Sequence, residues 1–227
     1  MLIYGKQPVQ YLLARHPQKI RTLYLAKELE QKEYGRLMRM GFEIKRIPPE
    51  AAQKMSRSGN HQGFLAEVEA VQPAGLGEIV SKDFVTVLCG VTDVGNIGAI
   101  VRSAYALGAG AVVITGMKSP SLAPIVRSST GALFDLPFNV TVNLYDVMTE
   151  LKNAGHRLYG AVMDGEDVRD IRFEGKRALL LGSEGEGLPA RAVRRLDRGV
   201  KIAMAHDFDS LNVSVAGAIL MDRMRAR

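Results

Sequence analysis

The sequence predicts an α/β fold in two parts, a small N-terminal α/β domain and a larger α/β domain with a doubly wound parallel sheet. Short strand-like runs alternate with helical runs along the whole chain. The strands of the second part are almost continuously apolar, as in parallel sheets that are covered on both faces. The 227 residues, 47% of them hydrophobic, are enough to build two cores.

The first part begins with a strand and then alternates helix and strand. The strands are predicted at 1–4, 20–25, 42–47 and 64–71. The helices are predicted at 8–15, 28–40 and 49–55. Gly41 ends the second of these helices. This order of elements favours an α/β sandwich.

The chain divides near residue 72, where Pro, Gly and small residues form a linker-like segment at 71–77. We expect a basic first domain at 1–72, a linker at 73–82 and a second domain at 83–227. Residues 1–72 carry 12 Lys and Arg but only 7 Glu and no Asp, whereas the remainder carries 18 basic and 17 acidic residues. This asymmetry is typical of a module that docks on a polyanion, and equally of a solvated basic face.

The second part continues the alternation with shorter and more apolar strands. Its strands are predicted at 84–91, 111–115, 158–163, 178–181 and 200–204. Its helices are predicted at 97–107, 144–153, 189–196 and 211–225. In an open sheet of this kind, ligands bind outside the carboxyl ends of the strands.

The composition excludes several classes of protein. Cys89 is the only cysteine, so the chain forms no intramolecular disulfide and no thiolate metal cluster. The four histidines lack metal-ligand spacing, so we expect no metal. No apolar run approaches the roughly 20 residues of a membrane span, and the N-terminus does not resemble a signal peptide. We therefore expect a reduced, cytoplasmic compartment and no membrane partner.

The first of three unusual segments runs from Gly90 to Arg102, from a strand end into a helix. Asn96 is predicted as the N-cap, and the neighbouring glycines allow a tight turn and a close backbone approach. Arg102 lies about a turn and a half into the helix in an otherwise apolar stretch. Taken alone, such an arginine is best explained as a side chain that extends to solvent.

The second segment runs from Leu179 to Pro189, where an apolar strand gives way to three glycines and two carboxylates. Glycines at a strand end expose backbone groups to a ligand. The segment matches neither a P-loop nor the GxGxxG fingerprint of dinucleotide sites. Its carboxylates favour a ligand with hydroxyl groups or positive charge, although a flexible turn before a helix would have the same composition.

The third segment runs from Ile202 to Ala216. Ser210 is predicted to cap the final helix, which leaves Asn212 and Ser214 in its first turn. Side chains there point toward whatever occupies the helix N-terminus. For Ser214, ordinary capping and surface polarity explain the residue well enough.

Together, the three segments resemble the motifs of the SpoU (TrmH-type) 2′-O-ribose RNA methyltransferases of the SPOUT superfamily. The matching runs are Asn96-x-Gly98-x-x-x-Arg102, Gly182-Ser183-Glu184-Gly185-x-Gly187-Leu188 and Ser210-Leu211-Asn212-Val213-Ser214-x-Ala216. The first part is similar to the family's small RNA-binding domain, with Ile3-Tyr4-Gly5 at its start and His61-Gln62-Gly63 near its end. The resemblance therefore covers essentially the whole chain.

The resemblance implies methyl transfer from S-adenosylmethionine to a ribose 2′-hydroxyl by a homodimer with a deep trefoil knot and no metal. The implied target is a guanosine of 23S rRNA, and the alternatives are a tRNA target or a non-catalytic RNA-binding protein. A nucleotide-dependent oxidoreductase is disfavoured, because the GxGxxG fingerprint of dinucleotide sites is absent.

The resemblance also assigns residues to roles. Arg102 would clamp the phosphate beside the ribose or act as the base, held in place by Asn96 and Glu184, while Ser210 and Asn212 would organise the loop and the ribose. The implied cofactor-binding residues are Leu181, Gly182, Gly187, Ile202, Met204 and Leu211. The candidate RNA-binding residues are Arg15, His16, Lys19, Arg21, Arg57, His61 and Gln62.

The chain departs from the family pattern at two places. Val94 follows Asp93 where the family has proline, and Ala203 stands where the family has proline between Ile and Met. Because the implied contacts near Ile202 are made by the main chain, the second change affects the rigidity of the loop more than the chemistry.

Overall fold

The computed structural model describes residues 1–207 and 210–225, and the chain forms two compact units. The first unit contains Met1–Gln72 and Ser121–Gly131, and the second contains Pro73–Pro120 and Ala132–Arg227. The segment at 121–131 thus joins the first unit, although the sequence places it within the second domain. The expected linker at 73–82 also contains a short helix, α4 (Leu76–Val80), whose Ile79 is fully buried.

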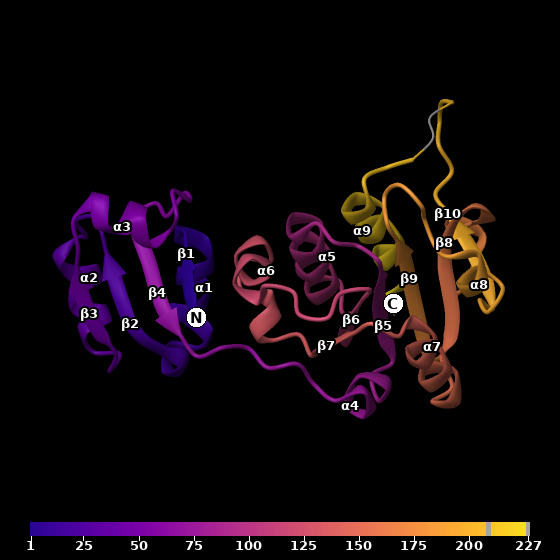
Figure 1. Cartoon of the computed structure of the whole chain (residues 1–227), viewed down its shortest axis with the longest axis horizontal. Helices are drawn as coiled ribbons and strands as arrows, with labels where there is room; N and C mark the ends of the chain where they lie inside the picture. Colours follow the sequence, from indigo (N-terminus) through magenta and orange to yellow (C-terminus); the bar gives the residue numbers. More distant parts are fainter. Residues whose placement is uncertain (208–209, 226–227) are drawn as a thin grey trace. The chain divides into compact units, whose positions relative to one another are not determined.

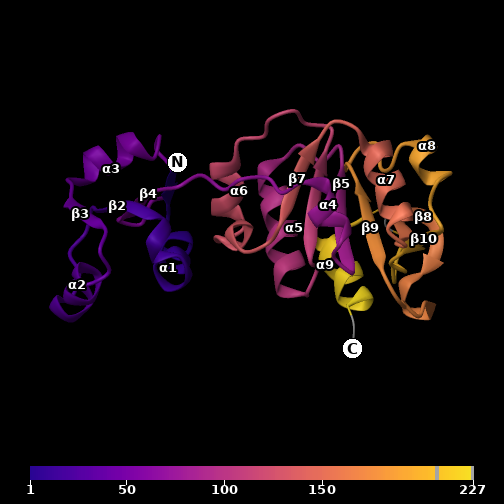
Figure 2. The ribbon, with the colours of Figure 1, turned by 90° about the horizontal axis from the view of Figure 1, so that it is seen from below.

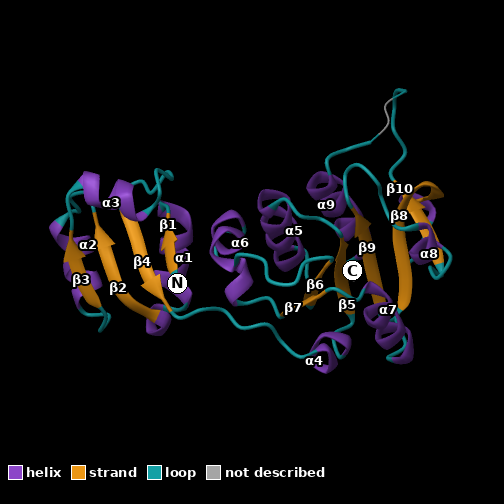
Figure 3. Ribbon diagram, in the orientation of Figure 1, coloured by secondary structure: helices purple, strands orange, loops and turns teal. Residues whose placement is uncertain are grey.

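The first unit is a four-stranded sheet with helices (Figures 1 and 3). Its elements are β1 (Leu2–Tyr4), α1 (Lys6–Arg15), η1 (Pro17–Lys19), β2 (Ile20–Leu25), α2 (Gln31–Met38), β3 (Glu43–Arg46), α3 (Pro49–Met55), β4 (Phe64–Val68) and α6 (Leu122–Ser128). The strand order is β1-β4-β2-β3, in which β4 runs antiparallel to β1 and β2 while β2 and β3 are parallel. The predicted alternation of strands and helices is therefore confirmed in this unit.

The second unit is built on a six-stranded, wholly parallel sheet in the order β10-β8-β9-β5-β6-β7. The strands are β5 (Phe84–Cys89), β6 (Ala111–Thr115), β7 (Phe138–Thr141), β8 (Arg157–Asp167), β9 (Arg177–Gly182) and β10 (Arg198–Lys201). The further helices are α5 (Val94–Ala106), η2 (Ala132–Phe134), α7 (Leu144–Asn153), η3 (Val168–Asp170), α8 (Ala190–Val193) and α9 (Val213–Met224). A parallel sheet of apolar strands is the fold that the sequence predicts.

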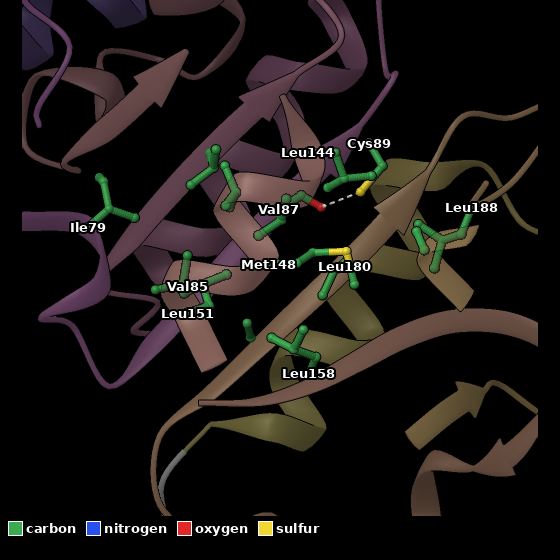
Figure 4. Close-up of a cluster of buried hydrophobic side chains, with 14 of the residues drawn as sticks. Ile79, Val85, Val87, Cys89, Leu144, Met148, Leu151, Leu158, Leu180 and Leu188 are labelled. Carbon is green, nitrogen blue, oxygen red and sulfur yellow. Dashed lines mark hydrogen bonds between the residues drawn. The ribbon is translucent and has the colours of Figure 1, made fainter. Parts of the chain in front are cut away.

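Alternating residues of β5 contribute to separate cores on the two faces of this sheet. Val85, Val87 and Cys89 pack with residues of α4, α7 and α8 in one buried cluster (Figure 4). Thr86, between them, points the other way and donates a hydrogen bond to the sulfur of Met221 in α9. Helices α5 and α9 lie side by side (Figures 1 and 2). Both faces of the strand are thus covered by helices, as its apolar composition requires.

The strand order reverses between β5 and β9. From β5 the chain continues to β6 on one side, whereas from β9 it continues to β10 on the other side, beyond β8. The ends of the two strands are adjacent, because Cys89 is paired with Gly182. Loops that leave two such strands in opposite directions open a crevice between them. The first two unusual segments of the sequence follow these two strands.

Two helix starts differ from the sequence prediction. Helix α5 begins at Val94 with Asp93 as its N-cap, whose carboxylate accepts a hydrogen bond of 2.7 Å from the backbone N–H of Asn96. Helix α9 begins at Val213 with Asn212 as its N-cap, and not Ser210. The cap of α5 thus lies three residues before the predicted one, and the cap of α9 two residues after it. Because Asp93 caps α5, the side chain of Asn96 is free to bind elsewhere.

Arg177 fastens the end of α9 to the start of β9. Its side chain is buried, and it donates hydrogen bonds to the carbonyl oxygens of Met224 and Gly175 at 2.5 Å and 2.9 Å. The guanidinium carbon lies 5.0 Å from the centroid of the Phe84 ring. Burial lowers the pKa of this guanidinium. Because Met224 ends α9, Arg177 satisfies a carbonyl that the helix itself leaves unpaired.

Replacing this side chain is expected to destabilise the second unit. Arg177→Ala removes two hydrogen bonds and leaves a void, so we expect the free energy of unfolding to fall by about 2 kcal/mol or more. Urea denaturation followed by circular dichroism measures the change. Arg172→Ala, which removes an exposed arginine, serves as the control. Equal stability of the two variants would show that Arg177 does not fasten α9.

Candidate functional site

Polar side chains from three distant segments meet at the carboxyl edge of the parallel sheet. The side-chain amide of Asn96 donates a hydrogen bond of 3.1 Å to the Oε1 atom of Glu184. The amide of Asn212 donates to the same oxygen at 2.5 Å and to the Oδ1 atom of Asn96 at 3.0 Å. We call these three residues the polar cluster. It connects the loop after β5, the loop after β9 and the start of α9.

Asn212 performs two tasks within the polar cluster. Its Oδ1 atom accepts hydrogen bonds from the backbone N–H and the hydroxyl of Ser214, at 2.9 Å and 2.6 Å, and thereby caps α9. Its Nδ2 atom donates to Asn96 and Glu184. Hydrogen bonds at both its oxygen and its nitrogen therefore fix the orientation of the Asn212 carboxamide. The hydroxyl of Ser214 contributes to this orientation, which the sequence reasoning did not foresee.

The loop that carries Glu184 folds back tightly against its own strand. A Cβ atom on Gly182 would overlap the carbonyl carbon of Gly187, so only glycine fits there. The backbone N–H of Gly187 donates to the carbonyl of Ser183 at 3.0 Å, and Gly187 itself has a φ angle of 65°. Glycine adopts this left-handed conformation without strain. Gly182 and Gly187 are therefore required by the turn that presents Glu184.

Hydrogen-bond donors and helix N-termini surround Glu184. Two neutral amides donate hydrogen bonds to its Oε1 atom. Asn96 lies in the first turn of α5 and Asn212 caps α9, so the N-termini of two helices lie at the cluster. Because the side chain is also exposed, the carboxylate is available to a hydroxyl or a cation from outside.

Arg102 does not join the polar cluster within one chain. It is exposed, and no hydrogen bond or ion pair connects it to another residue in the described part of the chain. Six residues of helix separate it from Asn96, which corresponds to about 9 Å along the axis and about 240° around it. Within one chain, no hydrogen bond therefore joins this guanidinium to Asn96 or Glu184, and the expectation that these two residues hold it stays a prediction for the homodimer. Ser210, the expected cap, is also exposed.

The residues expected to hold the cofactor lie around the same edge of the sheet. Leu181 and Gly182 end β9, Gly187 faces Gly182, Ile202 and Met204 follow β10, and Leu211 precedes Asn212. Leu181 is buried, whereas Met204 is 37% exposed. The edge thus combines open apolar side chains, glycine backbone and a carboxylate. This donor set fits a ligand that joins an aromatic base, a ribose and a positive charge.

Cys89, at the end of β5, does not provide a nucleophile. Burial raises the pKa of its thiol to about 12, and the sulfur points toward the carbonyl of Val87 at 3.8 Å (Figure 4). A thiol must ionise before it reacts readily, so this residue is inert at neutral pH.

The expected RNA-binding residues separate into two groups in the first unit. Arg15, His16, Lys19 and Arg21 lie where α1 ends and β2 begins, whereas Arg57, His61 and Gln62 precede β4. The register pairs Ile20 with Val68 and Leu25 with Phe64, so the two groups lie at opposite ends of this antiparallel pair. Six residues of strand separate them, which is about 20 Å. The structure therefore does not bring the seven residues together in one patch.

Among residues 1–207 and 210–225, no group of three or more His, Cys, Asp or Glu side chains could hold a metal ion. None of the helices within those ranges has the length and apolar character needed to cross a membrane.

Comparison with known proteins gives matches over the whole chain. Residues 83–222 match the SpoU rRNA Methylase family, and residues 2–74 match the family described as RNA 2′-O ribose methyltransferase substrate binding. The 23S rRNA (guanosine-2′-O-)-methyltransferase RlmB of Pseudomonas putida is 33% identical over 99% of this chain and 96% of its own length. The protein of the same name from Vibrio cholerae is 32% identical over 100% of this chain and 97% of its own.

Solved structures give the same fold. The SpoU methyltransferase AviRb from Streptomyces viridochromogenes, crystallised in complex with the cofactor AdoMet, has a TM-score of 0.81 and 29% identity. The match covers 99% of this chain and 88% of that one. An AdoMet-bound rRNA methyltransferase from Sinorhizobium meliloti has a TM-score of 0.78 at 23% identity, which supports the fold alone.

The buried thiol predicts a specific dependence of stability on pH. In the unfolded chain the thiol ionises near its ordinary pKa of 9.0, whereas in the folded chain it stays protonated to about pH 12. Stability from this group is thus complete below pH 9 and is lost as the pH rises above it. Relative to Cys89→Ala, the wild type is expected to lose about 1 kcal/mol between pH 8.5 and pH 10. Urea denaturation of both proteins measures this; a constant difference would contradict it.

Proposed function

Because this chain belongs to the SpoU rRNA methylase family, we propose that it transfers a methyl group from S-adenosylmethionine to the 2′-hydroxyl of a guanosine ribose in 23S rRNA. The observation that carries the proposal is the polar cluster. Three family motifs that lie far apart in the sequence meet there through direct hydrogen bonds, where the strand order reverses. The relatives that match over their whole length carry the same activity in their names.

S-adenosylmethionine, when bound, supplies a methyl group already activated by a sulfonium. The ribose oxygen forms a bond to the methyl carbon while the carbon–sulfur bond breaks, and the hydroxyl proton must leave. The chain therefore has to hold two partners in line and help to remove one proton. The residues of the edge are suited to these tasks, and the reaction requires no metal.

The backbone groups at Gly182, Ile202 and Leu211 would hold the cofactor, with Leu181, Gly187 and Met204 around its base. The tight turn at Gly182 keeps side chains away from the strand end, so a ligand can approach the backbone closely. Apolar side chains near such a backbone would bind a flat base well. The family fold includes a deep trefoil knot, and we propose that the C-terminal strands and α9 form it here.

Glu184 would act at the reacting groups. Its carboxylate, oriented by Asn96 and Asn212, can accept the hydrogen of the ribose hydroxyl or attract the positive sulfonium. Asn96 and Asn212 then act as positioning residues, because they hold the carboxylate in one orientation.

Arg102 would act across a dimer. A guanidinium stays protonated at neutral pH and is a poor base, but its planar fork binds a phosphate well. Helix α9, beside α5, exposes Val215 and Ile219 to 47% and 36%, at the i and i+4 positions of one face. We propose that this face forms a homodimer. Each Arg102 would then reach the polar cluster of the other subunit, which explains why it lacks a partner within its own described chain.

The first unit would hold the RNA. Its net charge of +5 over residues 1–72 and its match to a substrate-binding family support this role. The group that precedes β4, with Arg57, His61 and Gln62, includes two residues with positive φ angles, a conformation often found at binding loops. We also propose a cytoplasmic location, since rRNA is the proposed substrate. A tRNA target is the alternative that the same assays address.

The carboxylate of Glu184 is expected to be essential for methyl transfer. Glu184→Gln keeps the shape of the side chain but removes its charge, so the rate of methyl transfer to 23S rRNA is expected to fall by about 100-fold or more. Transfer of labelled methyl from S-adenosylmethionine, followed by mapping of 2′-O-methyl positions on 23S rRNA and tRNA, measures both rate and target. Glu186→Gln removes an equally exposed carboxylate two residues away and should retain the wild-type rate. Full activity of Glu184→Gln would refute the assigned role.

The dimer arrangement predicts complementation between two inactive variants. Co-expressed Arg102→Ala and Glu184→Gln chains would form heterodimers in which one site contains both intact residues. With random pairing, about a quarter of the wild-type number of sites is expected to be active. The methyl-transfer assay measures the recovered activity against that of each variant alone. No recovery in verified heterodimers would mean that Arg102 acts within its own chain.

A further inference from the structure

A second basic surface lies on α7 and α8, within the second unit and outside the polar cluster. Helix α8 and the turn after it carry four exposed arginines within eight residues: Arg191, Arg194, Arg195 and Arg198. Residues 73–227 as a whole carry 18 Lys and Arg against 17 Asp and Glu. Four of these 18 basic residues therefore lie within eight residues of one another, in a nearly neutral part of the chain.

Helix α7 provides the opposite side of this surface. Tyr145, Thr149 and Lys152 are spaced at i, i+4 and i+7, which places them on one face of the helix. Thr149 and Lys152, together with Arg194 and Arg195, line an open depression of about 400 Å³. Helices α7 and α8 lie close together in both views (Figures 1 and 2). We call this region the α7–α8 surface.

Two of the arginines are held in place by an aromatic ring. The guanidinium carbon of Arg191 lies 4.3 Å from the centroid of Tyr145, and that of Arg195 lies 5.4 Å from it. Stacking on an aromatic face orients a guanidinium while its N–H groups stay available. The surface is thus preorganised to donate hydrogen bonds outward.

The acidic groups nearby are already occupied. Asp197 accepts hydrogen bonds from the Nζ atom of Lys152 at 3.0 Å and from the backbone N–H of Leu158 at 2.8 Å. Glu166 pairs with Arg198 at 3.4 Å. In the described ranges, 1–207 and 210–225, no carboxylate pairs with the other three arginines. Their mutual repulsion is relieved by binding an anion with several charges.

We propose that the α7–α8 surface binds the phosphate backbone of the RNA substrate near the nucleotide that is methylated. The inference rests on the proposed function, because it takes the anion to be that RNA. Guanidinium forks match phosphate oxygens in pairs, and Lys152, Thr149 and Asn153 add further donors in the depression. Arg191 follows Glu184 by seven residues, a reach of at most about 25 Å, so the end of the surface formed by Arg191 and Tyr145 lies within a few nucleotides of the polar cluster.

The test compares RNA binding by the full chain and by the double variant Arg194→Gln/Arg195→Gln. The probe is 23S rRNA transcribed in vitro, and filter binding is measured over a series of salt concentrations. Loss of two phosphate contacts is expected to raise Kd about tenfold at 0.1 M salt and to reduce the slope of log K against log salt by about 1.4 to 1.8. Calorimetric affinity for S-adenosylmethionine and the methyl-transfer rate at saturating RNA should not change.

The control is Arg172→Gln/Arg225→Gln, which removes the same charge at exposed positions in the loop before β9 and at the end of α9, a helix that packs on the other face of the sheet from α7 and α8. Its Kd and salt slope should match those of the wild type. Wild-type binding by Arg194→Gln/Arg195→Gln, or equal weakening by both doubles, would overturn the proposal. The proposal would also be overturned if Arg194→Gln/Arg195→Gln bound RNA normally but lost binding to phosphatidylserine vesicles, because the surface would then bind a membrane. If the wild type binds the RNA and the double does not, but no 2′-O-methyl group forms, the surface stands and the proposed function fails.

Discussion

The carboxylate of Glu184, held by the amides of Asn96 and Asn212, is the interaction on which the arrangement of the site depends. It connects three loops that no backbone ladder joins, at the point where the parallel sheet reverses its strand order. The sheet brings the loops near one another, but the hydrogen bonds determine which side chains face the crevice. A single carboxylate thus serves both the local structure and the proposed chemistry.

The surrounding residues explain how so exposed a cluster keeps one geometry. Asp93 takes the capping task on α5 and frees the amide of Asn96. Asn212 caps α9 with its oxygen and binds Glu184 with its nitrogen, while Arg177 holds the far end of the same helix. Helix α9 is thereby fixed at both ends. A rigid support of this kind lets polar side chains at the edge act without large reorganisation.

The sequence predicts the central elements of the two units better than the short elements at the edge of the parallel sheet. Strands β2 and β6 and helices α3 and α7 lie where their patterns placed them, because their apolar periodicity is strong. Helix α6 was not predicted, since Pro124 suggests a break although proline is tolerated in a first helical turn. Strand β7 was not predicted either, because it is short and lies at the edge of the sheet.

The family resemblance predicted that the three motifs meet in one site. It did not predict the position of Arg102, because a motif does not state on which side of its helix a residue lies. Summing charge over a whole domain likewise hid the arginines of α8.

The most direct measurement of the central claim is a crystal structure of the chain with S-adenosylmethionine. We expect the cofactor's sulfonium to lie at the polar cluster, with its base among Leu181, Ile202 and Met204 and the three hydrogen bonds intact. A cofactor bound elsewhere, for example against α7, or a cluster that separates on binding, would contradict it.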